Sequence, residues 1–350
     1  MKKIAVVLMN LGGPDGPEAV EPFLYNLFSD PAILRVPNWL RRHFAKFIAR
    51  RRGKVAKDIY AQIGGKSPIL ENTQAQARAL EKAMSSTAWI RGFVVMRYWK
   101  PYAEDALAEI KRFVPDEIVL LPLYPQFSTT TTESSLAAWR LASRQAKLDI
   151  PESIVSAWPT HPGLIEAFAS LARQAWENAC ETCPPLPHGA YNQPRILFSA
   201  HGLPESIVRA GDPYPEQCRQ TAEAIARAMG IPDLDWVLCF QSRVGPVKWI
   251  GPSTEREIRR AGADKRPIVI VPISFVSEHS ETLVEIDIEY RKLAKKCDVP
   301  CFIYAGTPGT HPAFIAGLAD MIVEALQQPR REESPLGSPF GALANIRQTG

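Results

Sequence analysis

His201 directly follows an apolar run at residues 195–200 and precedes Gly202. An imidazole, with an ordinary pKa of about 6.5, can accept a proton or bind a metal ion at physiological pH. A lone histidine could equally be a structural residue held by hydrogen bonds. Its position at the carboxyl end of a predicted parallel strand, where α/β sheets bind their ligands, favours a functional role.

Glu281, Glu285 and Glu289 recur at intervals of four residues after a second apolar run at residues 267–273. Side chains at this spacing lie along one face of a helix. One interpretation is an ordinary solvated acidic face. However, apolar residues are interleaved with the glutamates, and the row begins at the end of a predicted strand. A row of carboxylates leading inward suits the passage of a divalent cation or of released protons, and oxygen ligands with one imidazole suit Fe²⁺.

A third strand end, within residues 121–132, is rich in serine and threonine. Such hydroxyl groups cap helices or bind phosphate, and capping is the more frequent role. The sequence contains neither a Walker A motif nor a G-x-G-x-x-G fingerprint. A dinucleotide-dependent oxidoreductase therefore has no support from the sequence.

Short apolar runs alternate with amphipathic stretches through most of the chain, which predicts an α/β protein with parallel sheets. Continuous Val, Ile and Leu runs are typical of parallel strands that are covered on both faces. The predicted strands are residues 4–9, 93–97, 117–123, 153–157, 195–200, 236–241, 267–273 and 300–304. The predicted helices include residues 73–84, 104–113, 163–178 and 216–229.

The chain divides into two similar halves. Residues 181–193 are rich in proline and mark a boundary. The run at residues 118–122 in the first half resembles the run at residues 268–272 in the second. We therefore expect two similar Rossmann-like domains, at residues 1–180 and 181–328. A disordered tail is expected at residues 329–350, where the hydrophobic periodicity ends.

Positive charge is concentrated in one segment. The net charge is only +4, yet residues 31–55 contain eight Lys or Arg and no Asp or Glu, interleaved with aromatic and aliphatic side chains. This pattern is typical of a helix that lies at a membrane surface. An ordinary surface helix packed on the core is the alternative. A nucleic-acid partner is not expected, because no nucleic-acid-binding motif accompanies the basic residues.

The sequence also indicates the compartment. The apolar start of the chain stops after a few residues without a cleavage site, and no stretch is long and apolar enough for a transmembrane helix. Six cysteines spread over a long chain predict free thiols in a reducing cytosol. Cys180 and Cys183 have metal-ligand spacing, but a plain loop is favoured because no second pair lies nearby.

Seven segments together resemble the ferrochelatase family, the terminal enzymes of haem synthesis. They run in the family's order through nearly the whole chain except the tail. The segments are residues 10–14 (NLGGP), 63–69 (IGGKSPI), 96–98 (MRY), 123–128 (LYPQFS), 198–204 (FSAHGLP), 240–246 (FQSRVGP) and 276–283 (VSEHSETL).

The resemblance implies a chelatase-like fold that inserts Fe²⁺ into protoporphyrin IX and releases two protons. His201 and Glu281 correspond to the family's catalytic and metal-site pair, and Glu285 and Glu289 to a secondary path. Residues that correspond to porphyrin contacts are Leu11, Arg52, Tyr60, Ser67, Arg97, Tyr98, Trp249 and Phe275. Residues 31–70 correspond to the lip of the porphyrin pocket, which in the family touches the membrane.

Iron is then expected as a substrate, with no other cofactor. No [2Fe–2S] cluster of the animal type is expected, because Thr129 stands where those enzymes have a cluster cysteine and no cysteine follows Cys301. Cys180 and Cys183 leave a different arrangement open. We expect a cytoplasmic protein that is peripheral on the inner face of the cytoplasmic membrane.

Several alternatives remain open at the level of sequence. The substrate could be coproporphyrin, and the metal could be cobalt or nickel, because affinity alone does not exclude other divalent ions. A non-catalytic porphyrin or haem carrier would need the cleft residues but not the row of carboxylates. The oligomeric state is not indicated.

Overall fold

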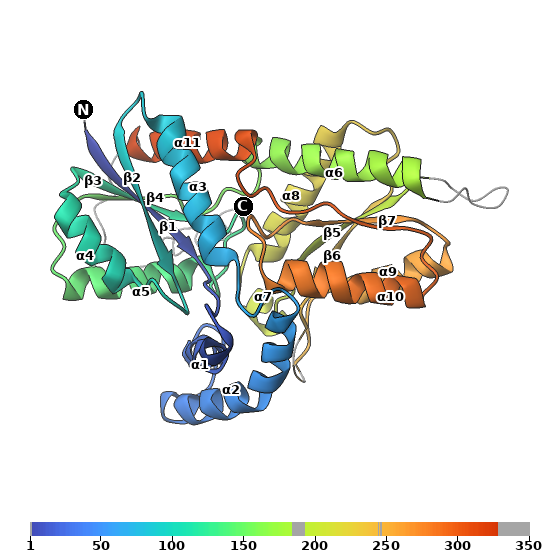
Figure 1. Ribbon diagram of the computed structural model, residues 1–350, viewed down its shortest axis with the longest axis horizontal. Helices are drawn as coiled ribbons and strands as arrows, with labels where there is room; N and C mark the ends of the chain where they lie inside the picture. The colour runs from blue at the N-terminus through green and yellow to red at the C-terminus, as the bar shows by residue number, and fades with distance from the viewer. Residues whose placement is uncertain (1, 184–192, 244, 246, 328–350) are drawn as a thin grey trace, which may run out of the picture.

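Two four-stranded parallel sheets form the centre of the computed structural model, which describes residues 2–183, 193–243, 245 and 247–327. The strand orders are β2-β1-β3-β4 and β6-β5-β7-β8, so the two sheets have the same topology (Figure 1). The strands of the first sheet are β1 (Lys3–Asn10), β2 (Trp89–Met96), β3 (Glu117–Pro122) and β4 (Glu152–Ile154). Those of the second are β5 (Arg195–His201), β6 (Trp236–Gln241), β7 (Ile268–Pro272) and β8 (Phe302–Tyr304).

Helices cover both faces of each sheet. The helices of the first half are η1 (Pro17–Ala19), α1 (Val20–Ser29), α2 (Asn38–Ala61), α3 (Ile69–Met84), α4 (Ala103–Phe113), α5 (Thr132–Gln145) and α6 (Pro162–Thr182), of which α1 and α2 pack mainly on each other. In the second they are α7 (Glu205–Arg209), α8 (Tyr214–Met229), α9 (Thr254–Ala263), the π-helix η2 (Glu281–Tyr290), α10 (Arg291–Lys296) and α11 (Pro312–Gln327). The predicted fold class, two similar α/β halves with parallel sheets, is confirmed.

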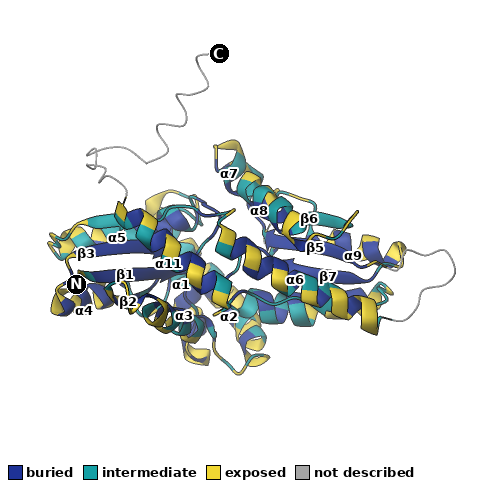
Figure 2. Cartoon of the chain, turned by 90° about the horizontal axis from the view of Figure 1, so that it is seen from above, coloured by how far each residue is buried: buried dark blue, intermediate teal, exposed yellow. Residues whose placement is uncertain are grey.

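The apolar runs form strands because both of their faces are buried. In β1, Ile4, Val6 and Leu8 face one hydrophobic core, and the residues between them face another. The first of these cores is shared, since it also contains Ile196 and Phe198 of β5. Seen from above, the two sheets lie along the length of the molecule with helices on either side (Figure 2). The shared core therefore joins the two halves into one body.

Two helices are exchanged between the halves. Helix α6 packs on β7 and β8 of the second sheet, although its sequence lies in the expected first domain. Conversely, α11 packs on α3, β3 and β4 of the first half. The strands of the two sheets thus lie on either side of residue 180, whereas α6 and α11 each pack on the other half; the division into two domains at residue 180 stays a prediction. Hydrophobic periodicity shows that a helix has an apolar face, but it does not show which sheet that face covers.

The exchanged helices begin in the same way and cross closely. His161 Nδ1 accepts a hydrogen bond from the Gly163 N–H at 3.3 Å, and His311 caps α11 in the same manner. A Cβ atom added to Gly163 would lie 2.7 Å from the Cα of Gly317. The crossing therefore requires glycine at both positions.

The cysteine prediction was partly wrong. Cys183, at the end of α6, forms a disulfide with Cys301, just before β8, whereas Cys180 is free and exposed. The bond joins residues separated by 118 positions, which sequence spacing could not indicate. Most of residues 181–193, and the expected tail at residues 329–350, lie outside the described part of the chain. Within the described part, no helix has the length and apolar character needed to span a bilayer.

Candidate active site

The carboxyl end of β5 positions His201. Its backbone N–H donates to Ser274 Oγ at 3.1 Å, and the residue pairs with Gln241 in the β5–β6 ladder. The ring Nδ1 lies 2.6 Å from the carbonyl oxygen of Gly202. Because a carbonyl can only accept, Nδ1 carries the proton, and the lone pair of the neutral ring is on Nε2.

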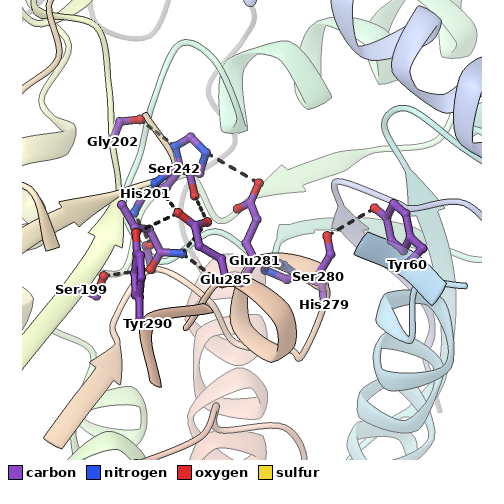
Figure 3. A network of polar contacts seen from close by, with 12 residues as sticks. Tyr60, Ser199, His201, Gly202, Ser242, His279, Ser280, Glu281, Glu285 and Tyr290 are labelled. Carbon is purple, nitrogen blue, oxygen red and sulfur yellow. Dashed lines mark hydrogen bonds and ion pairs between the residues drawn. The ribbon is translucent and has the colours of Figure 1, made fainter. Parts of the chain in front are cut away.

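Glu281, the first residue of η2, faces this lone pair. Its Oε1 lies 3.7 Å from Nε2 of His201 (Figure 3). The two side chains keep 33% and 39% of their surface exposed, respectively, so a bound substrate can reach both. Burial of the carboxyl group raises the pKa of Glu281; His201 and Arg52 oppose this effect, and the negative charge of Glu285 adds to it. Glu281 therefore holds a proton more readily than an ordinary glutamate.

A second histidine, His279, bonds the backbone of Glu281. His279 Nδ1 accepts a hydrogen bond from the Glu281 N–H at 3.1 Å. Its ring packs edge-on against Phe275, with 4.6 Å between the ring centroids. Burial, together with His201, lowers the pKa of His279 to about 3. His279 is thus neutral at physiological pH and acts as a hydrogen-bond acceptor that fixes the start of η2.

The next glutamate of the row is held by neighbouring groups. The carboxylate of Glu285 accepts hydrogen bonds from Gln241, from both the N–H and the hydroxyl of Ser242, and from Tyr290 (Figure 3). Glu289, one step further along, is exposed. Partial burial and the charge of Glu285 raise the pKa of Glu289. The helix carrying the row is a π-helix, whose i→i+5 hydrogen bonds give a wide turn that often marks a functional site.

Three of the predicted porphyrin contacts lie beside His201 and Glu281, the two poles of the site. The ring of Phe275 touches His279. Trp249 packs next to Gly202, where an added Cβ would lie 3.1 Å from the indole. Tyr60, at the end of α2, accepts a hydrogen bond from Ser280 at 3.3 Å, and burial raises its pKa to about 12.

The other predicted contacts belong to the first half. Arg97 and Tyr98 both bond the carboxylate of Asp30, at 2.7 and 2.8 Å, and the Tyr98 side chain is buried. Ser67 is buried in a turn, where its N–H donates to the Pro14 carbonyl. Leu11 packs against the cluster that contains Tyr98, and Arg52 is exposed on α2 with its guanidinium 5.9 Å from the Phe28 ring.

The first half also holds the loop that leads to Glu281. Gln76 of α3 donates to the carbonyls of Val276 and Gly309, at 2.9 and 3.0 Å. Asn72 of the same helix donates to the Glu278 carbonyl at 3.2 Å. These bonds fix the position of the loop from across the interface between the halves.

Several residues with structural roles in the site were not identified from the sequence. Asp30, Ser242 and Tyr290 each bond a predicted residue, and neither Asp30 nor Tyr290 directly follows a predicted strand. Ser242 lies inside one of the motif segments, directly after β6, and that position is the only signal that could have indicated it.

The comparison with known sequences decides the family. The family model described as Ferrochelatase matches residues 3–326. The chain belongs to the ferrochelatase family. It is 47% identical to a ferrochelatase of Caulobacter vibrioides (strain NA1000 / CB15N), over 97% of this chain and 96% of the relative. It is 49% identical to a ferrochelatase of Phenylobacterium zucineum, over 97% of this chain and 94% of that relative.

Solved structures agree in fold. The structure described as SirB from Bacillus subtilis with Fe³⁺ superposes with a TM-score of 0.52 at 12% identity, covering 93% of this chain and 96% of that one. A sirohydrochlorin chelatase SirB in complex with cobalt gives a TM-score of 0.51 at 12% identity, covering 94% of this chain and 97% of that one. At this identity the likeness shows the chelatase-like fold alone.

Membership of the ferrochelatase family confirms the resemblance predicted from the motifs. Thr129, which the resemblance predicts at the position of the animal cluster cysteine, donates its N–H and its hydroxyl to the carboxylate of Asp212, both at 2.8 Å. Among the described residues, no group of three or more His, Cys, Asp and Glu is arranged to hold a metal ion.

Proposed function

We propose that this chain inserts Fe²⁺ into protoporphyrin IX and releases two protons, with His201 and Glu281 at the reacting centre. The observation that carries the proposal is the pair itself. An imidazole lone pair and a carboxylate of raised pKa face each other at 3.7 Å, at the carboxyl end of a parallel strand. The family of the chain supports the same reaction.

The pair can account for both protons. The lone pair on His201 Nε2 can accept one pyrrole proton, since the Nδ1–H is already bonded to the Gly202 carbonyl. Glu281 can accept the second, because burial raises its pKa towards neutrality. Each acceptor then returns its proton to solvent, to which both side chains are partly exposed. Iron is the substrate of this step and not a resident cofactor.

The porphyrin is proposed to lie against the aromatic groups around the pair. Phe275 and Trp249 flank the two poles, and Tyr60 approaches from the first half. Arg52 is the exposed cation whose charge reaches Glu281, so it is a candidate for a propionate contact. A flat macrocycle hides its nitrogen lone pairs, so binding energy from such contacts can be used to bend it.

Protoporphyrin emission tests the function directly. Under anaerobic conditions, adding Fe²⁺ to the wild-type protein should abolish the emission of bound protoporphyrin as haem forms, and His201→Ala should slow this loss. Coproporphyrin, Co²⁺ and Ni²⁺ in the same assay define the specificity. A wild-type protein that binds protoporphyrin but never metallates it would be a carrier and would refute the proposal.

We also propose that α2 contacts a membrane surface. Three aromatic side chains on this basic helix are exposed, namely Trp39 (74%), Phe47 (60%) and Phe44 (45%). Basic residues beside exposed aromatic groups suit an anionic bilayer. A W39S/F47S variant should bind vesicles containing phosphatidylglycerol less strongly than wild type. The matched control is Trp89→Ser, which removes an exposed tryptophan of β2 (55%). Equal binding by all three proteins would exclude this surface.

A further inference from the structure

The carboxylate of Glu285 has all of its hydrogen-bonding capacity in use. Its Oε1 accepts from the Ser242 N–H and from the Tyr290 hydroxyl, both at 2.8 Å. Its Oε2 accepts from the Ser242 hydroxyl and from Gln241 Nε2. A carboxylate offers about four lone-pair sites, so four donors fill them. A metal ion could bind Glu285 only after at least one of these bonds broke.

Ser242 donates twice from an unusual backbone conformation. Its φ is +61°, in the left-handed region that residues other than glycine seldom occupy. Strain of this kind persists where the surroundings impose it, and it is concentrated at functional sites. Here the Glu285 carboxylate holds Ser242 in this conformation, because it accepts hydrogen bonds from both the backbone N–H and the hydroxyl of Ser242.

Gln241 connects this arrangement to both poles of the site. Its backbone pairs with His201 in the β5–β6 ladder. Its side-chain amide donates to the carbonyl oxygen of Glu281 at 3.0 Å as well as to the Glu285 carboxylate at 3.3 Å. The amide oxygen accepts a hydrogen bond from the Ser199 hydroxyl at 2.8 Å, which fixes the side chain to β5. The end of β6 is therefore bonded to the strand that carries one pole and to the helix that carries the other.

We propose that Gln241 and Ser242 are positioning residues that anchor η2 through Glu285 and so set the separation of Glu281 from His201. Glu285 is then a fixed anchor and does not carry iron or protons along the row. Glu289, which is exposed, remains the candidate for first contact with the ion. The inference rests on the proposed iron insertion, and it assigns a different role to one residue expected on the metal path.

Substitutions at Ser242 distinguish loss of its hydrogen bond to Glu285 from general loss of folding stability. Ser242→Gly suits the left-handed backbone and keeps the N–H, but it removes the hydroxyl donor. Ser242→Asn also tolerates this conformation and restores a side-chain donor. We expect Ser242→Gly to unfold at the wild-type temperature and to bind protoporphyrin normally, as measured by fluorescence titration. Its kcat/KM for Fe²⁺ should fall roughly 10- to 100-fold, the usual effect of removing a group that orients a metal-site residue. Ser242→Asn should recover most of that loss.

Combination with Glu285→Gln distinguishes an anchor from a carrier. If Ser242 acts through Glu285, each single variant lowers kcat/KM for Fe²⁺, and the double variant is no worse than the poorer single one. If Glu285 carries the ion, freeing its lone pairs in Ser242→Gly should leave kcat/KM unchanged or raise it, while Glu285→Gln abolishes turnover. That second pattern would overturn the inference while leaving iron insertion intact. Failure of the wild-type protein to metallate would instead refute the proposed function.

Discussion

Removing both poles of the site should cost less activity than the two single losses predict. The variants are His201→Ala, Glu281→Gln and the double substitution. Each single variant removes a proton acceptor, for which a loss of roughly 10²- to 10⁴-fold in kcat is usual. If the two groups acted independently, these factors would multiply in the double variant.

The geometry gives the size of the coupling. When His201 is protonated during turnover, its Nε2 is 3.7 Å from the Glu281 carboxylate. At about 4 Å and an effective dielectric constant of about 20, two unit charges attract by about 4 kcal/mol. The side chains are 39% and 33% exposed, so solvent screening reduces this value, and about 1–2 kcal/mol is a reasonable expectation. Each 1.4 kcal/mol corresponds to about a tenfold change in rate.

The double variant should therefore be roughly 5- to 30-fold more active than the product of the single losses predicts. The assay is the anaerobic loss of protoporphyrin emission on adding Fe²⁺, with porphyrin binding measured separately. His43→Ala and Glu109→Gln, both at exposed positions of other elements, control for general effects of the same substitutions. Single losses that multiply fully would refute the reasoning, because the two groups would then work without influencing each other.

Three further predictions concern pH, packing and redox state. Burial lowers the pKa of His279 to about 3, so below about pH 6.5 the unfolded state binds a proton that the folded state does not, and wild-type stability decreases in acid. Denaturant titration should show a loss of at most about 2 kcal/mol between pH 6.5 and pH 5. The His279→Asn variant should lack this loss. Gly163→Ala should lower stability by about 1–3 kcal/mol through its clash at the helix crossing, whereas Gly53→Ala, with no neighbour closer than 3.8 Å, should not destabilise the fold. Reduction of the Cys183–Cys301 bond should lower the free energy of unfolding by about 2–4 kcal/mol, and the melting temperature should fall accordingly. The same reducing treatment should leave the melting temperature of a Cys183→Ser variant unchanged.

The proximity of His201 and Glu281 could be predicted from the sequence because their signals are local. His201 and the row that begins at Glu281 each follow an apolar run, and parallel sheets bring strand ends together. The π-helix could not be predicted in the same way. Glutamates spaced by four residues lie along one face of an α-helix and nearly along one face of a π-helix, so the spacing does not distinguish the two.

The hydrogen bonds that hold the site residues in place were not indicated by the sequence, because they join residues that are distant in the chain. Arg97 was expected at the porphyrin, but the partner that fixes it, Asp30, lies 67 residues away. Ser242 and Glu285 are 43 residues apart, and either alone would be an ordinary polar residue. Such pairs depend on the packing of the whole chain, and no local pattern encodes them.

The matching topologies of the two sheets allow equivalent strand ends to be compared between the halves. β1 and β5 occupy the same position in their sheets, and their last residues are Asn10 and His201. Asn10 is buried, and its amide donates to Thr73 of α3 at 3.2 Å, so it holds that helix but cannot take up a proton. The same strand end in the second half carries an imidazole that remains accessible to substrate. In the proposed function, the edge of the second sheet provides the acid–base pair, and α3 beside the first sheet holds the loop before Glu281 through Gln76 and Asn72. On this reasoning, Gln76→Ala should impair iron insertion although it lies in the other half, because releasing that loop would loosen η2 at its first residue.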